Sequence, residues 1–374
     1  MTFKELMENY KNGTATPEER EQVERELEKY ETISQHYMNE IPLEEEEPEK
    51  NEAEWKKIRG KLKKRNVLLA VFILLAVIIV SWGSIAINAE HYLSKLWYDP
   101  NENHFGSEFA TDLELALEAA TELYMPSVRT ESVISERTGV GRYDLSIQQW
   151  DNSENEIRYC FGNVERNRIT LNRDFYQYAS ANAFENSDPY NEGIQTPKDE
   201  IMAKVGMLPE YVRCKTYISF GKDVSTETLA EILEKYDLYA YWAGVRVAEQ
   251  DRQIYPLTGF DPSGAGYIRA AVEEKYPYYE IGEHRKEDMG MVFEEHFKSL
   301  LRLAMDENIY PKLNQVGFND VSEHQEYLDY VEENGVKTYG FVASLTREQI
   351  AQLATEEVIS GFYIDDLQLE IPWE

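Results

Sequence analysis

The clearest hydrophobic pattern in the chain is one long stretch without charge. Residues 66–89 contain no Asp, Glu, Lys or Arg, and residues 67–80 form an unbroken apolar run. A helix of about 20 apolar residues spans about 30 Å, the thickness of the hydrocarbon core of a bilayer. The pattern therefore predicts a transmembrane helix over residues 66–88. A buried core helix is the weaker alternative, and a cleaved signal peptide is disfavoured because its N-terminal region would be short rather than 65 residues long.

The polar and apolar positions before this stretch predict a helical hairpin over residues 1–45. Gly13 stands where a glycine commonly ends a helix. Thr16 can cap a second helix, Pro17 suits its first position, and Glu19 completes a capping box. Pro42 ends the second helix. The apolar stripe of the two helices consists of Phe3, Leu6, Met7 and Tyr10, followed by Val23, Leu27, Tyr30, Ser34, Tyr37 and Ile41.

The pattern after the apolar stretch predicts an α+β fold. We expect a juxtamembrane and first region over residues 89–195 and a C-terminal domain over residues 196–374, because residues 180–198 are rich in Asn, Asp, Pro and Gly. In the first region we predict a helix over residues 113–125 and strands over 143–150, 157–161 and 168–171.

The second region contains a loose internal repeat. A strand–helix–strand pattern covers residues 211–220, 226–236 and 238–248, and it recurs over 336–345, 347–353 and 358–369. Thr226 and Thr346 stand where a helix N-cap is expected. Two β-α-β units, joined by helices around 292–305 and 323–333, predict a mixed or antiparallel sheet covered on one face.

Charge gives the chain an orientation. The formal net charge is −32, with 17 acidic and 6 basic residues in 1–55, seven basic and no acidic residues in 56–65, and 53 acidic and 25 basic residues in 88–374. Residues 46–65 are thus an acidic and then basic linker. By the positive-inside rule, the basic cluster predicts a single-pass protein of the cell membrane with a cytoplasmic N-terminus and an extracytoplasmic C-terminal domain. The acidic remainder argues against direct binding of nucleic acid.

Motifs that carry chemistry are missing from the sequence. It contains no H-E-x-x-H, no G-x-S-x-G and no phosphate-binding loop. Glu294-Glu295-His296 lacks a second histidine at helical spacing, so a solvated helix face is favoured over a metal site. Cys160 and Cys214 can form at most one disulfide. We therefore expect neither an enzyme, nor a cofactor, nor a bound metal.

Several segments resemble the membrane-bound sigma factor regulators (anti-sigma factors) of Gram-positive bacteria. These are Tyr10-Lys11-Asn12-Gly13 before the acidic helix, the basic cluster with one span, Tyr236-Asp237-Leu238, Trp242-Ala243-Gly244-Val245, Gly259-Phe260 and Tyr339-Gly340-Phe341-Val342. The resemblance implies a negative regulator of transcription that acts in signal transduction and the stress response. Its cytoplasmic hairpin would hold an extracytoplasmic-function sigma factor, and its outer domain would respond to envelope conditions, with a membrane protease or a second membrane regulator as further partners. The His-Cys-Cys zinc set of many such proteins is missing from these helices, so zinc binding is not implied.

Two interpretations of the apolar stripe remain open. The stripe can close the two helices on each other or on a second copy, or a partner protein can complete it. In the second case the partner-binding residues are Phe3, Leu6, Tyr10, Val23, Leu27, Tyr30 and Tyr37. The alternative function is an extracytoplasmic sensing or binding module that the N-terminal part merely anchors, without sigma factor binding. A membrane-tethered envelope enzyme is disfavoured by the motif search.

Overall fold

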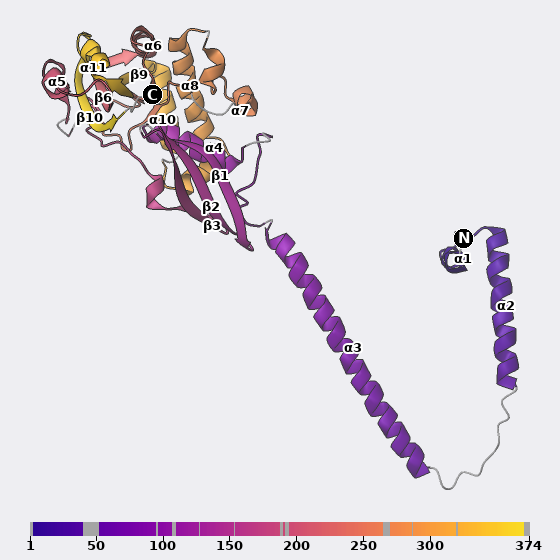
Figure 1. Cartoon of the computed structure of the whole chain (residues 1–374). Coiled ribbons are helices and arrows are strands. Elements are labelled where there is room, and N and C mark those ends of the chain that lie inside the picture. The colour runs from indigo at the N-terminus through magenta and orange to yellow at the C-terminus, as the bar shows by residue number, and fades with distance from the viewer. Residues whose placement is uncertain are drawn as a thin grey trace. The chain divides into compact units, whose positions relative to one another are not determined.

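The computed structural model divides the chain into two compact units, Met1–Ser84 and Ile85–Glu374 (Figure 1). It describes residues 3–39, 52–94, 96–106, 110–126, 128–152, 154–187, 190, 194–264, 270–285, 287–318 and 321–369. Side chains are described for the same residues except 37–39, 52–62, 85–94, 270 and 271. We call the second unit the C-terminal body.

The N-terminal part consists of α1 (Phe3–Lys11), α2 (Pro17–Asn39) and the long helix α3 (Glu52–Ser94). Within α3, residues Lys63–Ser84 are long and apolar enough to cross a membrane, with a mean hydropathy of 2.7 and no buried side chain. The helix is longer than the predicted 66–88 at both ends. Lys, Arg and Glu favour helices, and the sequence has no proline between Pro48 and Pro100, so parts of the predicted linker and juxtamembrane segment are helical. The predicted helix end at Pro42 lies outside the described residues.

The first sheet of the C-terminal body is an antiparallel meander that follows one helix. Helix α4 (Asp112–Tyr124) leads into β1 (Val128–Gly139), β2 (Arg142–Asp151), β3 (Glu156–Glu165) and β4 (Arg168–Leu171), which pair in that order. The predicted helix and three predicted strands are confirmed, but β1 was missed. In β1, Val133 stands opposite buried Ile147 of β2, and Ser135 stands opposite buried Leu145. Because one of these two inward positions is polar, apolar residues do not alternate regularly along the strand. Bulges at Thr130/Ser132 and Arg137/Gly139 also shift its phase.

The second sheet has the strand order β5-β10-β6-β9-β7-β8, with every neighbouring pair antiparallel. Its main elements are β6 (Val212–Ser225), α6 (Thr226–Lys235), β7 (Ala240–Val245), β9 (Lys337–Thr346), α11 (Arg347–Leu353) and β10 (Ile359–Leu369), and its edges are β5 (Thr196–Pro197) and β8 (Gly259–Phe260). Strands β6 and β7 are therefore parallel with β9 between them, and β9 and β10 are parallel with β6 between them. The predicted repeat is confirmed as two interlocked split β-α-β units.

The N-cap predicted for α11 is the observed one, whereas the N-cap of α6 lies one residue before the predicted position. Thr346 caps α11 in a complete capping box with Gln349. The cap of α6 is Ser225, whose hydroxyl accepts a hydrogen bond from the Thr228 amide, and not Thr226. Serine and threonine are both good N-caps, and a pattern alone does not separate two that are adjacent.

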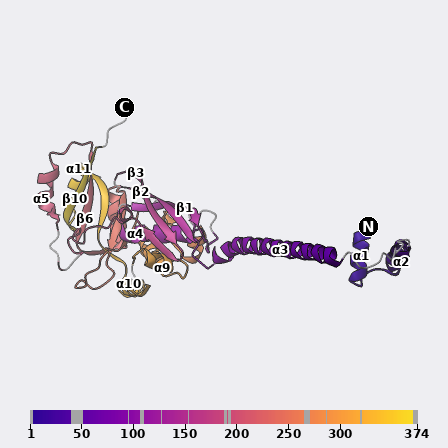
Figure 2. The same cartoon turned by 90° about the horizontal axis from the view of Figure 1, so that it is seen from below.

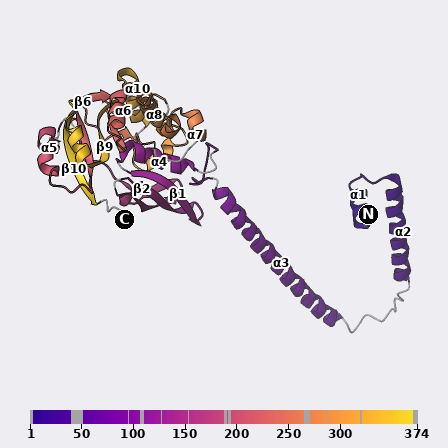
Figure 3. The ribbon, with the colours of Figure 1, turned by 45° about the horizontal axis from the view of Figure 1, so that its top comes forward.

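Further helices complete the body between and after these strands. They are η1 (Arg173–Phe175), α5 (Lys198–Val205), α7 (Ala270–Lys275), η2 (Ile281–His284), α8 (Met289–Ala304), α9 (Tyr310–Gln315) and α10 (Val321–Asn334). Helix α8 packs against α4, α6 and α10. Figures 2 and 3 show the meander of β1, β2 and β3 beside the sheet of β6 and β10 within the body.

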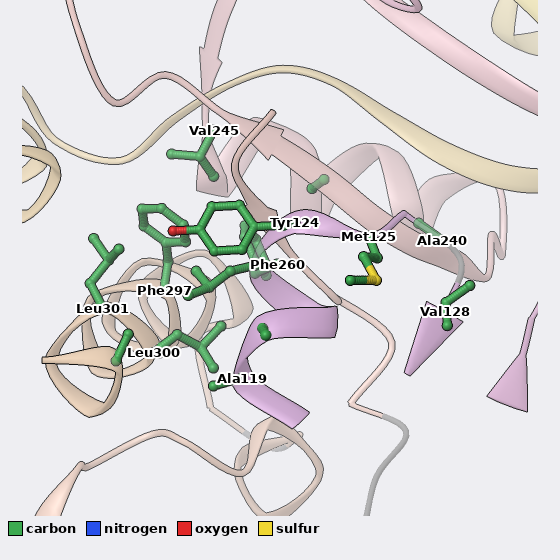
Figure 4. Close-up of a cluster of buried hydrophobic side chains, with 14 of the residues drawn as sticks. Ala119, Tyr124, Met125, Val128, Ala240, Val245, Phe260, Phe297, Leu300 and Leu301 are labelled. Atoms are coloured by element: carbon green, nitrogen blue, oxygen red, sulfur yellow. The ribbon is translucent and has the colours of Figure 1, made fainter. Parts of the chain in front are cut away.

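One hydrophobic core joins both sheets. It contains residues of α4 and the meander, such as Tyr124 and Val128, together with residues of the second sheet and α8, such as Phe260 and Phe297 (Figure 4). A smaller cluster around Phe184 and Trp242 covers the other face of the second sheet, which was predicted to be covered on one face only. The predicted boundary near residue 195 thus separates two sheets but not two cores. Cys160 and Cys214 are both buried and free.

Candidate functional site

The turn between α1 and α2 is built from local hydrogen bonds, as the sequence predicts. Gly13 adopts a positive φ of 73°, which glycine tolerates without a steric cost. The Thr16 hydroxyl accepts a hydrogen bond from the Glu19 amide at 3.4 Å, and a Glu19 carboxylate oxygen accepts one from the Thr16 amide at 2.9 Å. This capping box fixes where α2 begins and turns the chain back along α1.

The core of this hairpin is very small. Among the described residues 3–36, three apolar side chains are buried: Leu6 with 6% of its surface exposed, Ala15 with 8%, and Val23 with 0%. The Tyr10 hydroxyl adds a hydrogen bond to a Glu24 carboxylate oxygen at 3.2 Å. A fold this small usually needs a partner, a metal or a disulfide for stability.

Three further predicted residues of the apolar stripe face solvent. Phe3 is 49% exposed, Leu27 44% and Tyr30 77%. Ile33, 54% exposed, extends the same surface, although the sequence interpretation did not include it; its spacing of three from Tyr30 and four from Tyr37 is the signal that could have revealed it. Tyr37 lies in α2, but its side chain is outside the described residues. Among the predicted residues whose side chains are described, Leu6 and Val23 are thus buried, Tyr10 is half-buried, and the other three are exposed.

Acidic groups surround the exposed stripe. Residues 17–31 of α2 carry seven Glu and three Lys or Arg. Two of the bases are already paired within the helix, Arg25 with Glu21 at 2.8 Å and Lys29 with Glu26 at 2.7 Å. Such exposed pairs add little stability. The surface that remains combines exposed apolar side chains with excess negative charge, which suits a partner with an apolar groove and a basic rim.

A second notable cluster lies in the C-terminal body, where α4, α8 and the segment after β8 meet. His296 of α8 is buried, and its Nε2 lies 2.6 Å from a Glu122 carboxylate oxygen of α4. The His296 Nδ1 lies 3.0 Å from the Tyr278 carbonyl oxygen, which can only accept, so Nδ1 carries a hydrogen. The same Glu122 oxygen accepts a hydrogen bond from the Asp261 amide at 3.2 Å. The prediction that Glu294-Glu295-His296 is a solvated helix face is wrong for His296, because its partner lies 174 positions earlier in the chain.

Burial and charge oppose each other in this cluster. Burial of the imidazole on its own lowers the pKa of His296, but the Glu122 carboxylate and the Tyr278 carbonyl outweigh it and the net pKa is raised. Burial, and after it the Glu122 charge, raises the pKa of Asp261 from its ordinary value of 3.8 to about 7. A cavity of about 50 Å³ lies beside these groups. The cluster therefore binds protons more tightly in the folded chain than in the unfolded chain.

Asp261→Asn is expected to remove part of the pH dependence of stability. Since the folded carboxyl group holds its proton up to about pH 7 and the unfolded one loses it near pH 4, this group lowers wild-type stability as the pH rises between these values. An amide stays neutral and can still accept the 2.8 Å hydrogen bond from the Ser263 amide. At pH 8 the variant should exceed the wild type by about 1 kcal/mol or more, with the gap closing towards pH 4. Urea unfolding between pH 4 and 8 measures it, and a gap that does not change with pH contradicts the argument.

One group of side chains in the described residues has the spacing of a cation site. Ligand atoms of Glu102, His104 and Asp112 lie within 4.8 Å of one another. However, the Lys312 ammonium lies 3.4 Å from an Asp112 carboxylate oxygen, and His104 Nδ1 lies 2.5 Å from the same oxygen atom. These two groups supply the positive charge and the hydrogen bonds that the buried carboxylate requires, so the cluster has an explanation without a metal.

A comparison of the chain with known protein families gives a match over the second sheet. Residues 206–366 match the family model described as sigma factor regulator C-terminal. This part of the chain is a sigma factor regulator C-terminal domain. The match begins just before β6 and ends within β10, so the family's domain corresponds to the two interlocked β-α-β units with the helices between them. The resemblance to sigma factor regulators is confirmed for these residues.

This family is one of regulatory proteins rather than of enzymes. Membership of the matched domain in it implies that the protein interacts with a sigma factor. Neither the curated proteins nor the solved structures give a match to the chain. The matched residues do not include the N-terminal hairpin, and nothing in the match assigns the individual partner-binding residues.

Proposed function

We propose that the protein is a membrane-anchored anti-sigma factor that sequesters an extracytoplasmic-function sigma factor through its N-terminal hairpin. The observation that carries the proposal is the exposed apolar stripe on a hairpin whose own core consists of three side chains. This hairpin belongs to a chain with a sigma factor regulator domain. A folded partner that covers the stripe would supply the burial that the two helices lack.

The seven predicted partner-binding residues have two roles in this proposal. Phe3, Leu27 and Tyr30, together with Tyr37, would contact the sigma factor directly. Leu6 and Val23 are buried between the helices, so they would hold the hairpin in its binding conformation. Tyr10, through its hydrogen bond to Glu24, would orient α1 against α2. The acidic rim suits a sigma factor, since a protein that binds DNA presents basic surfaces.

The proposal places the chain up to the basic cluster of residues 56–65 in the cytoplasm, the uncharged stretch of residues 66–88 in the membrane and the rest of the chain outside. It rests on the seven basic residues of 56–65 next to the one described helix that is long and apolar enough to span a bilayer. The body would then respond to envelope conditions, and the sigma factor would be released by proteolysis near the span or through a second membrane regulator.

Leu27→Asp is expected to free the sigma factor, because a charge at the centre of the exposed stripe must be desolvated when a partner covers it. The amount of sigma factor that co-purifies with the membrane-bound full chain should fall at least tenfold, and a reporter of its regulon should rise. Thr32→Asp is the matched control, since Thr32 is exposed and the substitution adds the same charge on the side of α2 opposite Leu27 and Tyr30. Unchanged co-purification with Leu27→Asp, at a normal membrane level of the protein, would exclude the stripe from the mechanism.

The competing function is an outer sensing or binding module that the N-terminal part merely anchors. Under this alternative, removal of residues 1–45 leaves the regulatory phenotype intact, whereas the anti-sigma proposal requires that this deletion release the sigma factor. The same reporter distinguishes the two.

A further inference from the structure

A groove of about 940 Å³ lies between the two sheets of the C-terminal body. Its floor is the helix-free face of the second sheet, where Gln368 of β10 stands directly opposite Arg213 of β6, and Ser344 of β9 is the diagonal neighbour of Arg213 on the other side. Its wall comes from β1, the end of β2 and the turn after β2, with Arg129, Trp150 and Asn155. The volume is at the upper end of the range for small-molecule sites.

Aromatic rings line the groove at both sides. Tyr239, just before β7, is 50% exposed, and its ring lies 6.0 Å from that of buried Tyr241. On the opposite side, the Arg129 guanidinium lies 5.9 Å from the centre of the Trp150 ring and holds this side chain in place. The second sheet, through Tyr239, and the meander, through Trp150, thus each provide a flat aromatic surface on which a ring-shaped ligand can stack.

Half of the remaining polar side chains of the groove are neutral hydrogen-bonding groups. Asn152 and Asn155 lie on the wall, and Ser344 and Gln368 lie on the floor. The amide nitrogen of Gln368 is buried and has no hydrogen-bond partner within the described part of the chain. A buried donor in this state costs free energy unless a ligand or water accepts from it. The lining charges balance, with two Arg, Glu154 and Asp366.

From these features we propose that the groove is a binding site for a short, neutral oligosaccharide. A sugar ring presents an apolar face of C–H groups to an aromatic ring and hydroxyls around its edge to amide side chains, which both donate and accept hydrogen bonds. The groove supplies both kinds of partner. The proposal concerns the C-terminal body alone and does not depend on sigma factor binding by the hairpin.

An extended peptide and a lipid fit the same lining less well. A peptide that adds to a sheet needs an open strand edge, whereas β6 and β9 of the floor are paired on both sides and β10 is open only on the side away from β6. A lipid chain or an apolar side chain needs an aliphatic pocket, and in the lining of this groove Leu369 is the aliphatic residue.

The groove adjoins the buried cluster of His296. Arg129 and Tyr241 line both the groove and the small cavity beside Glu122 and Asp261. A sugar in the groove would therefore contact side chains that reach the joint between α4 and the second sheet. Occupancy of the groove would stabilise the arrangement of the two sheets seen here by mass action.

The test is isothermal titration of the full chain in phosphatidylcholine nanodiscs, which, unlike sugar-based detergents, present no glycan. The probes are chitotriose, maltotriose and cellotriose, with the neutral peptide Gly-Ala-Gly-Ala-Gly as the competing class. At least one trisaccharide should bind saturably, and Tyr239→Ala and Gln368→Ala should each weaken it at least tenfold. Phe161→Ala is the matched control, since this aromatic ring is 53% exposed on the meander and does not line the groove.

Three outcomes would overturn the proposal: no saturable binding of any trisaccharide, equal binding by the wild type and both groove variants, or binding of the peptide but not of sugars. Folding is checked in the same samples, because Cys160 and Cys214 are buried in the body and should stay protected from a thiol reagent. Leu27→Asp should leave sugar binding unchanged, so that failure of this proposal and failure of the anti-sigma proposal are separate results.

Discussion

Trp242→Ala is expected to lower the free energy of unfolding of the C-terminal body by about 3–5 kcal/mol. The Trp242 ring is 1% exposed and stacks with Phe184, with ring centres 6.2 Å apart. Its Nε1 donates a hydrogen bond to the Glu122 carbonyl oxygen at 2.9 Å, one of the last carbonyls of α4, which the helix itself cannot pair. A Cβ added at Gly259 would stand 2.4 Å from the ring, so β8 packs directly against it. Truncation leaves a cavity that this close packing cannot fill.

Urea titration of the full chain with pulse labelling of thiols measures this effect. The two cysteines of the sequence lie in the C-terminal body, one in each sheet, so the label reports the unfolding of this body and not of the hairpin. Trp242→Phe keeps most of the ring but loses the N–H donor, and it should cost about 1–2 kcal/mol. Tyr159→Ala, at a side chain that is 56% exposed, should stay within about 0.5 kcal/mol of wild type. A loss with Trp242→Ala no larger than that control would contradict the packing argument.

The sequence predicts those parts of the fold that local patterns determine. The turn at Gly13 and the caps at Thr16 and Thr346 depend on residues within four positions of each other, and a sequence window contains all of them. The two β-α-β units likewise repeat a local alternation of strand and helix periodicity. Their interlocked order does not follow from that pattern, because the pairing of β6 with both β9 and β10 depends on contacts more than 110 residues apart.

Strand β1 and His296 show what a local pattern misses. Two bulges and several polar inward positions hide β1 from a search for alternating apolar residues. His296 follows Glu294 and Glu295, which both pair with Lys298 at the surface, so the sequence around it is typical of a solvated helix. Only the folded chain brings Glu122 to it. A buried ion pair is a tertiary feature without a local signal.

For the hairpin, periodicity identified the stripe but not which part of it is covered. Helix α1 has 9 residues and α2 has 23, so at 1.5 Å per residue the shorter helix can cover less than half of the longer one. The covered part contains Val23, and the uncovered part contains Leu27, Tyr30 and Ile33. The two interpretations of the stripe thus apply to different segments of one surface. Self-closure accounts for its beginning, and a partner would account for the rest.

Glu122 joins three elements of the C-terminal body through one residue. Its backbone carbonyl oxygen accepts a hydrogen bond from the Trp242 indole of β7. Its carboxylate contacts the His296 imidazole of α8 and accepts a hydrogen bond from the Asp261 amide after β8. Glu122 belongs to α4, which precedes the meander, and its partners belong to the matched sigma factor regulator domain. The residue therefore ties the meander to that domain.

Glu122→Ala is expected to destabilise the body by about 3–5 kcal/mol, because loss of one partner leaves the other charge buried and unpaired. The loss should grow as the pH falls. In the wild type, the raised pKa of His296 contributes stability that is present below about pH 6.5 and is lost as the pH rises through the folded pKa. Without Glu122, burial lowers the pKa of the imidazole, so acid favours the unfolded chain and the gap to wild type is wider at pH 5 than at pH 8.

Glu122→Gln separates charge from hydrogen bonding. The amide oxygen can accept from the Asp261 amide while the amide nitrogen donates to Nε2 of a neutral His296, so the loss at pH 8 should be about 1 kcal/mol. Thiol labelling in urea also tests whether Glu122 holds the meander to the second sheet. Mass spectrometry resolves the labelling of Cys160 from that of Cys214. In the wild type both cysteines should become labelled at the same urea concentration, and in Glu122→Ala Cys160 of the meander should become labelled at a lower one. Coincident midpoints in Glu122→Ala, or a loss that does not change between pH 5 and 8, would show that this pair does not hold the meander to the second sheet.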